Sequence, residues 1–163
     1  MRILLVKPKA RLATVRGLQG FQRLEPLELG YLAAVVPPPH AVQAIDLRLW
    51  RFADRAFVRA LGRFRQDLVG ISGYTHEGSE VKRLAGIVRH CLPGAQVVVG
   101  GHHATVAPRD YDVSAIDAIV RGEGCAPFAA IVARLAAGEA LDGIPQVLLP
   151  GERFDAAAAD GWP

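Results

Sequence analysis

This chain repeats a succession of a short apolar run, a glycine-bearing turn and a helical pattern, and this repeat narrows the possible folds to a few. Residues 67–71 (DLVGI) are the central example, because they are mostly apolar, include β-branched side chains and show no polar alternation. Such a run predicts a strand that is buried on both faces of a parallel sheet. Apolar residues then recur at spacings of three and four over residues 77–91, which predicts an amphipathic helix.

The same succession recurs along the whole chain. Strands are predicted at residues 3–6, 41–47, 67–71, 96–99 and 116–120, with a further candidate at 144–149, and helices at 25–36, 54–64, 77–91 and 126–137. This alternation predicts an α/β fold with three layers, doubly wound around a mainly parallel five-stranded sheet. We expect the flavodoxin-like strand order 2-1-3-4-5, with a crevice between the first strand and the central one. We expect a long basic connection at residues 7–24 and a long turn at 100–111.

Length and composition narrow the class of protein. A chain of 163 residues is typical of one domain, which we expect at residues 1–149, followed by a tail or the start of a missing linker at 150–163. No apolar run approaches the roughly 20 residues of a membrane span. Two cysteines without disulfide-like spacing, Cys91 and Cys125, favour a reducing, cytoplasmic setting. The net charge is only +3, and the arginines are spread along the chain rather than gathered on one predicted face, so we expect no nucleic-acid partner.

Three glycine-rich turns follow predicted strands. They are Ser72-Gly73-Tyr74-Thr75 with the adjacent His76, then Gly100-Gly101-His102, then Gly122-Glu123-Gly124. Glycine lets a backbone approach a ligand closely, and the carboxyl ends of parallel strands meet at one edge of the sheet. The three turns therefore predict one binding crevice, although each glycine could equally make only a tight turn.

Metal and common enzyme motifs are not present. The histidines His76, His102 and His103 lack the spacing of a zinc site, so a single histidine beside a cofactor is the better hypothesis. The chain contains no G-x-G-x-x-G after its first strand, no G-x4-G-K-[ST] and no G-x-S-x-G. Dinucleotide-binding, P-loop and acyl-transfer classes are therefore not supported.

Five segments in order resemble a known family. They are EPLELGYLA at residues 25–33, DLR at 46–48, DLVGIS at 67–72, VGGHHAT at 99–105 with Pro108, and VRGEG at 120–124. Together they resemble the amino-terminal cobalamin-binding domain of cobalamin-dependent radical S-adenosylmethionine enzymes. The resemblance covers nearly the whole chain. It implies a corrinoid across the carboxyl edge of the sheet, with its nucleotide tail threaded into the domain.

The resemblance also implies roles for individual residues. Ser72 and Thr75 would hydrogen-bond the tail, Gly100 and Gly101 would let the backbone pass close to the base, and Glu123 would accept a hydrogen bond from a ribose or a corrin amide. His102 and Thr105 would line the same wall. The implied cofactor-binding set is Ser72, Gly73, Tyr74, Thr75, His76, Gly100, Gly101, His102, Thr105, Gly122, Glu123 and Gly124, with no metal ligand among them.

Two departures from the family pattern shape the functional hypothesis. The D-x-H-x-x-G loop that brings a histidine to cobalt in other cobalamin domains is replaced after the first strand by KPKAR at residues 7–11, which implies base-off binding without that ligand. Cys91 and Cys125, 34 positions apart, cannot supply the three-cysteine motif of a [4Fe-4S] cluster. The resemblance thus implies that the cluster and S-adenosylmethionine belong to a missing domain or to a partner, and that this chain alone is not catalytic.

Two other functions remain open on sequence alone. One is an interaction module that kept the fold and lost the ligand. The other is a small flavodoxin-like protein that binds a flavin or a nucleotide.

Overall fold

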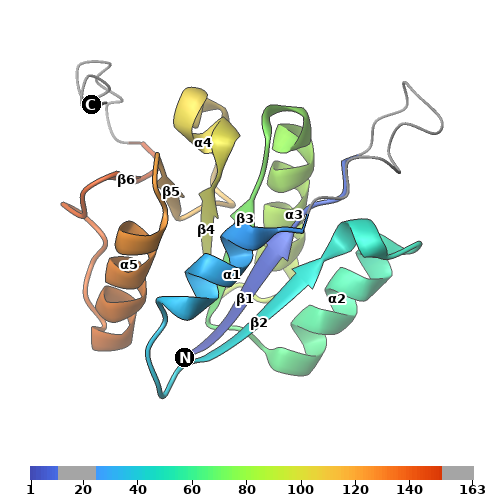
Figure 1. Ribbon diagram of the computed structural model, residues 1–163, viewed down its shortest axis with the longest axis horizontal. Coiled ribbons are helices and arrows are strands. Elements are labelled where there is room, and N and C mark those ends of the chain that lie inside the picture. Colours follow the sequence, from blue (N-terminus) through green and yellow to red (C-terminus); the bar gives the residue numbers. More distant parts are fainter. Residues whose placement is uncertain (11–24, 152–163) are drawn as a thin grey trace.

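A six-stranded sheet organises the molecule. The computed structural model describes residues 1–10 and 25–151, and its strands lie in the order β2-β1-β3-β4-β5-β6 (Figure 1). The strands are β1 (Arg2–Lys7), β2 (Ala41–Asp46), β3 (Leu68–Ser72), β4 (Gln96–Gly100), β5 (Ala118–Val120) and β6 (Val147–Leu148). Neighbours from β2 to β5 are parallel, which confirms the predicted flavodoxin-like order. The further candidate strand at 144–149 exists as the two residues of β6, which pair antiparallel with β5 and make the sheet six-stranded rather than five-stranded.

Helices connect the strands as the periodicity predicts, with one exception. The helices are α1 (Leu27–Ala34), α2 (Ala53–Phe64), α3 (Gly78–Cys91), α4 (His102–Val106) and α5 (Cys125–Ala137), with 3-10 turns η2 (Leu47–Leu49), η3 (Thr75–Glu77) and η4 (Pro108–Tyr111). The prediction of a long turn at 100–111 is wrong, because α4 and η4 occupy it. A helix of five residues is too short to show an apolar period, so it leaves no pattern in the sequence. The predicted connection at 7–24 and tail at 150–163 lie largely outside the described residues.

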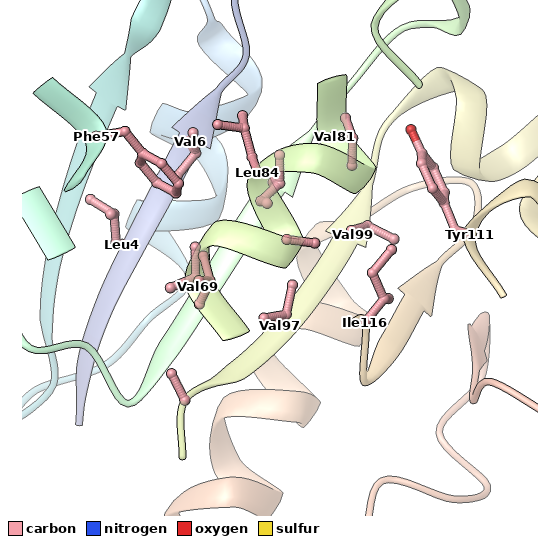
Figure 2. Close-up of a cluster of buried hydrophobic side chains, with 14 of the residues drawn as sticks. Leu4, Val6, Phe57, Val69, Val81, Leu84, Val97, Val99, Tyr111 and Ile116 are labelled. Carbon is pink, nitrogen blue, oxygen red and sulfur yellow. The ribbon is translucent and has the colours of Figure 1, made fainter. Parts of the chain in front are cut away.

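The helices form a layer on each face of the sheet. Helices α2 and α3 pack on one face, where Leu4, Val6, Val69, Val97 and Val99 point to the same side from β1, β3 and β4 (Figure 2). The other face is covered by α1 and α5, whose apolar residues pack against the alternate strand positions. Every residue of β3 is buried, which confirms that the central strand is buried on both faces. No helix in the described part of the chain is long and apolar enough to cross a membrane.

The prediction that the arginines are spread without a common face is wrong for α2. Arg51, Arg55, Arg59 and Arg63 line one groove beside this helix. A four-residue step turns an α-helix by only about 40° beyond a full turn, so successive members of such a series stay on one side. The strand–helix pattern predicted α2 itself, but the arginine period was not recognised.

Candidate functional site

An apolar slot of about 400 Å³ opens between α1 and α5 over the carboxyl ends of β3, β4 and β5. Its lining is Glu28, Leu29, Tyr31, Leu32, Gly70, Ile71, Ser72, Val98, Gly100, Gly101, Val120, Gly122, Glu123, Gly124, Cys125 and Phe128. This slot does not lie between β1 and β3, where we expected the crevice. On this face of the sheet Ile3 and Leu5 of β1 are fully buried in the core beside α1, so the open space lies further along, over β3 to β5.

The floor of the slot depends on a glycine in the middle of β3. A Cβ atom on Gly70 would lie 3.0 Å from Leu5 Cδ2 and 3.5 Å from Phe128 Cε2. Any larger side chain would therefore reach into the space between α1 and α5. A glycine inside an otherwise apolar strand often marks a close approach of a ligand or a backbone. That signal was present in the sequence, but the predicted site did not include Gly70 or its neighbours Val98, Val120 and Phe128.

Six of the twelve predicted residues line the slot, all at its rim. They are Ser72 at the end of β3, Gly100 and Gly101 after β4, and Gly122, Glu123 and Gly124 after β5. The register of the sheet brings them together, because Ser72 is paired with Gly100 and Val99 with Ile119. The three glycine turns thus converge at one edge, as predicted, since parallel strands end on the same side.

Gly101 holds two of these turns in direct contact. It has a φ of 91°, and a Cβ atom there would lie 2.9 Å from both the Gly73 carbonyl oxygen and Ser72 Oγ. The Gly73 N–H donates to the Gly100 carbonyl at 3.1 Å, and the His103 N–H donates to the Gly73 carbonyl at 3.2 Å. Because only glycine combines a positive φ with this absence of bulk, Gly101 sets the relative position of the β3 and β4 turns.

Thr105 ties the third turn to the second. The Gly122 N–H donates to Thr105 Oγ1 at 2.9 Å, and the Thr105 hydroxyl donates to the Gly101 carbonyl at 3.2 Å. Thr105 is therefore placed behind the rim rather than in the lining of the slot. Its hydroxyl positions Gly122, which has a φ of 68° and does line the slot.

The remaining predicted residues lie outside the slot. Tyr74 and His76 are exposed and stack with their rings nearly parallel, 6.1 Å between centroids, and Thr75 between them is exposed as well. His102 is exposed on α4 rather than in an extended turn, and Gly73 faces away from the slot. A Cβ atom on Gly73 would lie 2.6 Å from Val81 Cγ2 of α3, so this glycine serves packing on the α3 face. Within the described ranges, 1–10 and 25–151, no group of three or more His, Cys, Asp or Glu side chains could hold a metal ion.

A buried ion-pair network joins the slot to the Tyr74 turn. Lys7, only 1% exposed at the end of β1, places its Nζ 3.2 Å from Glu77 Oε2 and 3.4 Å from Glu28 Oε1. The same ammonium lies 4.1 Å from the centroid of the Tyr74 ring, and Glu77 Oε2 accepts a hydrogen bond from the Tyr74 N–H at 2.9 Å. A buried charge persists only with such partners. The sequence placed Lys7 in a basic loop, so this network was missed.

Glu123 and Cys125 are joined by hydrogen bonds at the start of α5. The Cys125 N–H donates to Glu123 Oε1 at 2.7 Å. Hydrogen bonds from the Cys125 thiol and from nearby backbone N–H groups hold the pKa of Glu123 below its usual value. The same contact raises the pKa of the Cys125 thiol, because the neighbouring carboxylate favours the protonated sulfur. Cys125 was not among the predicted site residues, and no sequence signal distinguished it from Cys91.

The fold and the slot together define a flavodoxin-like α/β domain with an apolar ligand site at the carboxyl edge of its sheet. The family model of the B12 binding domain matches residues 15–132, and the chain belongs to this family.

Two curated relatives extend this finding. The chain is 34% identical over 148 residues to an uncharacterized methyltransferase of Pyrococcus horikoshii, covering 88% of this chain and 31% of that protein. It is 32% identical over 158 residues to the hopanoid C-3 methylase of Methylococcus capsulatus, covering 93% of this chain and 30% of that protein. The chain therefore spans less than a third of the length of these relatives. It is a cobalamin-binding domain related to methyltransferases.

The residues around the slot fit a flat aromatic base that carries polar groups at one end. The absence of a side chain at Gly70 keeps the floor hollow, and Phe128 and Leu32 provide apolar walls. The polar side chains of the lining include Ser72 and Glu123 beside the turn glycines, and Glu28 and Tyr31 on α1. An apolar interior with a few polar groups at the mouth is the usual composition of a cofactor site.

Proposed function

We propose that this domain binds cobalamin base-off, with the nucleotide tail in the slot between α1 and α5. Base-off means that the nucleotide base does not ligate cobalt. The observation that carries the proposal is the apolar slot that opens where the three glycine turns meet, in a chain of the B12 binding family. β1 ends on Lys7, a buried lysine in an ion-pair network, and Pro8, Lys9 and Ala10 follow it, so no histidine ligand is supplied from that position.

In this proposal the slot residues divide by depth. Gly70 and Phe128 at the bottom would contact the base, while Ser72, Gly101 and Glu123 at the rim would contact the sugar, the phosphate or the amide groups of the corrin. The exposed residues outside the slot would meet the ring rather than the tail; they are Tyr74, Thr75, His76 and His102. Gly73 and Thr105 would act only by positioning the turns.

We further propose that the domain serves a radical S-adenosylmethionine methyltransferase or cyclase-type enzyme, in the same polypeptide or as a separate chain. A bound cobalamin supplies a cobalt centre for methyl transfer. The support is that one relative is named a methyltransferase and the other a methylase, and that this chain covers less than a third of the length of each. The two cysteines lie on different helices, α3 and α5, and do not form a cluster-binding motif. The iron–sulfur cluster and S-adenosylmethionine would therefore belong to another domain or partner.

Binding is tested directly with hydroxocobalamin. The purified chain is incubated with excess cofactor and passed over a gel-filtration column while the visible spectrum is recorded. We expect the corrinoid to co-elute with the protein and to show a base-off spectrum. Co-elution with a base-on spectrum would contradict the proposed binding mode alone, whereas a colourless protein peak at saturating cofactor would contradict cobalamin binding. A yellow protein with a flavin spectrum would favour the flavin alternative.

A substitution in the slot separates binding from folding. Gly124 has an ordinary φ of −93°, and a Cβ atom there meets only Leu32 Cδ2 at 3.5 Å, so Gly124→Leu should fold while filling the mouth of the slot. We expect it to weaken hydroxocobalamin binding by about tenfold or more, because a buried side chain replaces ligand volume. Gly86→Leu on α3, where a Cβ atom meets nothing within 4 Å, is the matched control and should bind as the parent does. Equal affinities for the two variants would place the ligand elsewhere.

A further inference from the structure

A second concave surface lies on the opposite side of the molecule from α5, beside the edge strand β2. It is a groove of about 580 Å³ between β2 and α2, and we call it the arginine groove. Figure 1 shows α2 and β2 together at the end of the sheet away from β6. Four exposed arginines at four-residue spacing line it, Arg51, Arg55, Arg59 and Arg63. The slot for the cofactor shares no residue with this groove.

The positive charge of the groove is not neutralised within the described part of the chain. No ion pair is formed there by any of the four arginines; Arg51 and Arg55 only lie over the Phe52 ring, each 5.3 Å from its centroid. The carboxylates nearest in sequence are engaged elsewhere, since Asp46 pairs with Arg48 at 2.8 Å and Asp54 with Arg83 at 2.6 Å. Arg55, Arg59 and Arg63 follow one another along α2, and Arg51 lies in the turn just before it. Like charges at four-residue spacing repel one another, so this arrangement lowers the stability of the isolated domain. An anionic partner would remove that cost.

The groove also has an apolar component. Ile45 of β2 and Ala56 and Ala60 of α2 lie among its lining residues, and Trp50 and Phe52 at one end are 50% and 59% exposed. Along β2 itself, Ala41, Gln43 and Ala44 are exposed, and its one strand neighbour in the described sheet is β1. Exposed aromatic residues beside arginines are typical of the energetic centre of a protein interface.

We propose that the arginine groove docks a helix of a protein partner that presents a row of carboxylates at four-residue spacing. In an α-helix this spacing corresponds to a rise of about 6 Å, so a row of glutamates on the partner matches the pitch of the three arginines on α2, Arg55, Arg59 and Arg63. Each pair can form the two-pronged contact that guanidinium and carboxylate groups prefer. The small side chains of Ala56 and Ala60 leave room for the partner's backbone to approach.

Two other occupants fit the groove less well. A second copy of the chain would bring the same four arginines against the first set, and the like charges would oppose association. A single-stranded nucleic acid gains much of its affinity from bases stacked on free aromatic faces. Here the ring of Phe52 already lies under two guanidinium groups, and the net charge of the chain is only +3.

The test uses a designed helical peptide with glutamates at positions 1, 5, 9 and 13, labelled for fluorescence anisotropy. A second peptide of the same composition has its glutamates distributed around the helix. We expect the aligned peptide to bind the protein about tenfold more tightly than the distributed one, and high salt to weaken it, since exposed ion pairs are screened. Equal binding of the two peptides would overturn the proposal.

Matched variants locate the surface. Arg59→Glu should weaken binding of the aligned peptide by about tenfold, because it removes one arginine–glutamate ion pair and adds a repulsive charge. Lys82→Glu on α3 makes the same change of charge outside the groove and should leave binding unchanged. Neither residue lies in the cofactor slot, so hydroxocobalamin binding serves as the check that both variants are folded. Equal weakening by both variants would overturn the proposal. Tighter binding of a single-stranded oligonucleotide than of the aligned peptide, lost in Arg59→Glu, would also overturn it in favour of nucleic acid.

Discussion

Replacing Gly101 by alanine should strongly destabilise the domain. The added Cβ atom would lie 2.9 Å from the Gly73 carbonyl oxygen and from Ser72 Oγ, and 3.0 Å from the Gly73 nitrogen. Two of these atoms are backbone, so no rotamer change can relieve the overlap. Gly101 also has φ 91° and ψ −171°, a region that is nearly closed to other residues.

The magnitude follows from these two contributions. The backbone conformation costs about 1–3 kcal/mol and the overlap about 1–3 kcal/mol, so the free energy of unfolding should fall by about 2–6 kcal/mol. For a chain of this length each kcal/mol lowers the melting temperature by about 2–4 °C. A thermal melt followed by circular dichroism should therefore show a loss of at least about 4 °C.

Two further glycines separate the contributions. Gly138 ends α5 with a φ of 72°, but a Cβ atom there meets nothing within 4 Å. Gly138→Ala should therefore lower the free energy of unfolding by only about 1 kcal/mol, the cost of the backbone conformation alone. Gly62 lies inside α2 with ordinary dihedrals and open space, so Gly62→Ala should stabilise by about 0.5–1 kcal/mol. If Gly101→Ala costs no more than Gly138→Ala, the inference that the β3 and β4 turns are locked in contact at Gly101 is wrong.

Two other predictions concern the contact between Glu123 and Cys125 and the buried Lys7. Alkylation requires the thiolate, and the Glu123 carboxylate raises the pKa of the Cys125 thiol, so Cys125 should be alkylated slowly below that pKa. Glu123→Gln removes the carboxylate and should shift the pH profile of the alkylation rate to lower pH. Mass spectrometry measures the alkylation rate of Cys125, with the exposed Cys91 as internal control. Bound hydroxocobalamin should protect Cys125 and not Cys91, and equal protection would contradict the proposed slot. Lys7→Met leaves Glu77 buried without its cation, so the free energy of unfolding measured in urea should fall by about 3–5 kcal/mol. Adding Glu77→Gln should recover most of this loss. A fall below about 1 kcal/mol for Lys7→Met would show that the buried pair is not stabilising.

Short-range patterns were sufficient to predict most of the fold. Apolar runs such as residues 67–71 and the helical period of residues 77–91 correspond to β3 and α3, and their alternation predicted a doubly wound parallel sheet. The order of the first five strands is not readable from periodicity; the flavodoxin-like order was expected because five strands suffice for it, and it is the order observed. The prediction missed α4 because local sequence patterns do not determine this helix. This five-residue helix is held by contacts to other segments, including the hydrogen bond from the His103 N–H to Gly73, and such contacts leave no period in the sequence.

The slot was predictable only at its rim. Glycines after strands mark turns, and parallel strands bring their carboxyl ends to one edge, so residues 72, 101 and 123 could be expected at one edge of the sheet from sequence alone, and all three line the slot. Which of the turn residues line the slot could not be predicted, because it depends on how α1 and α5 are spaced over Gly70 and on which way each turn faces. The buried pairing of Lys7 likewise required residues about seventy positions apart to meet, and a one-dimensional pattern carries no information on such distances.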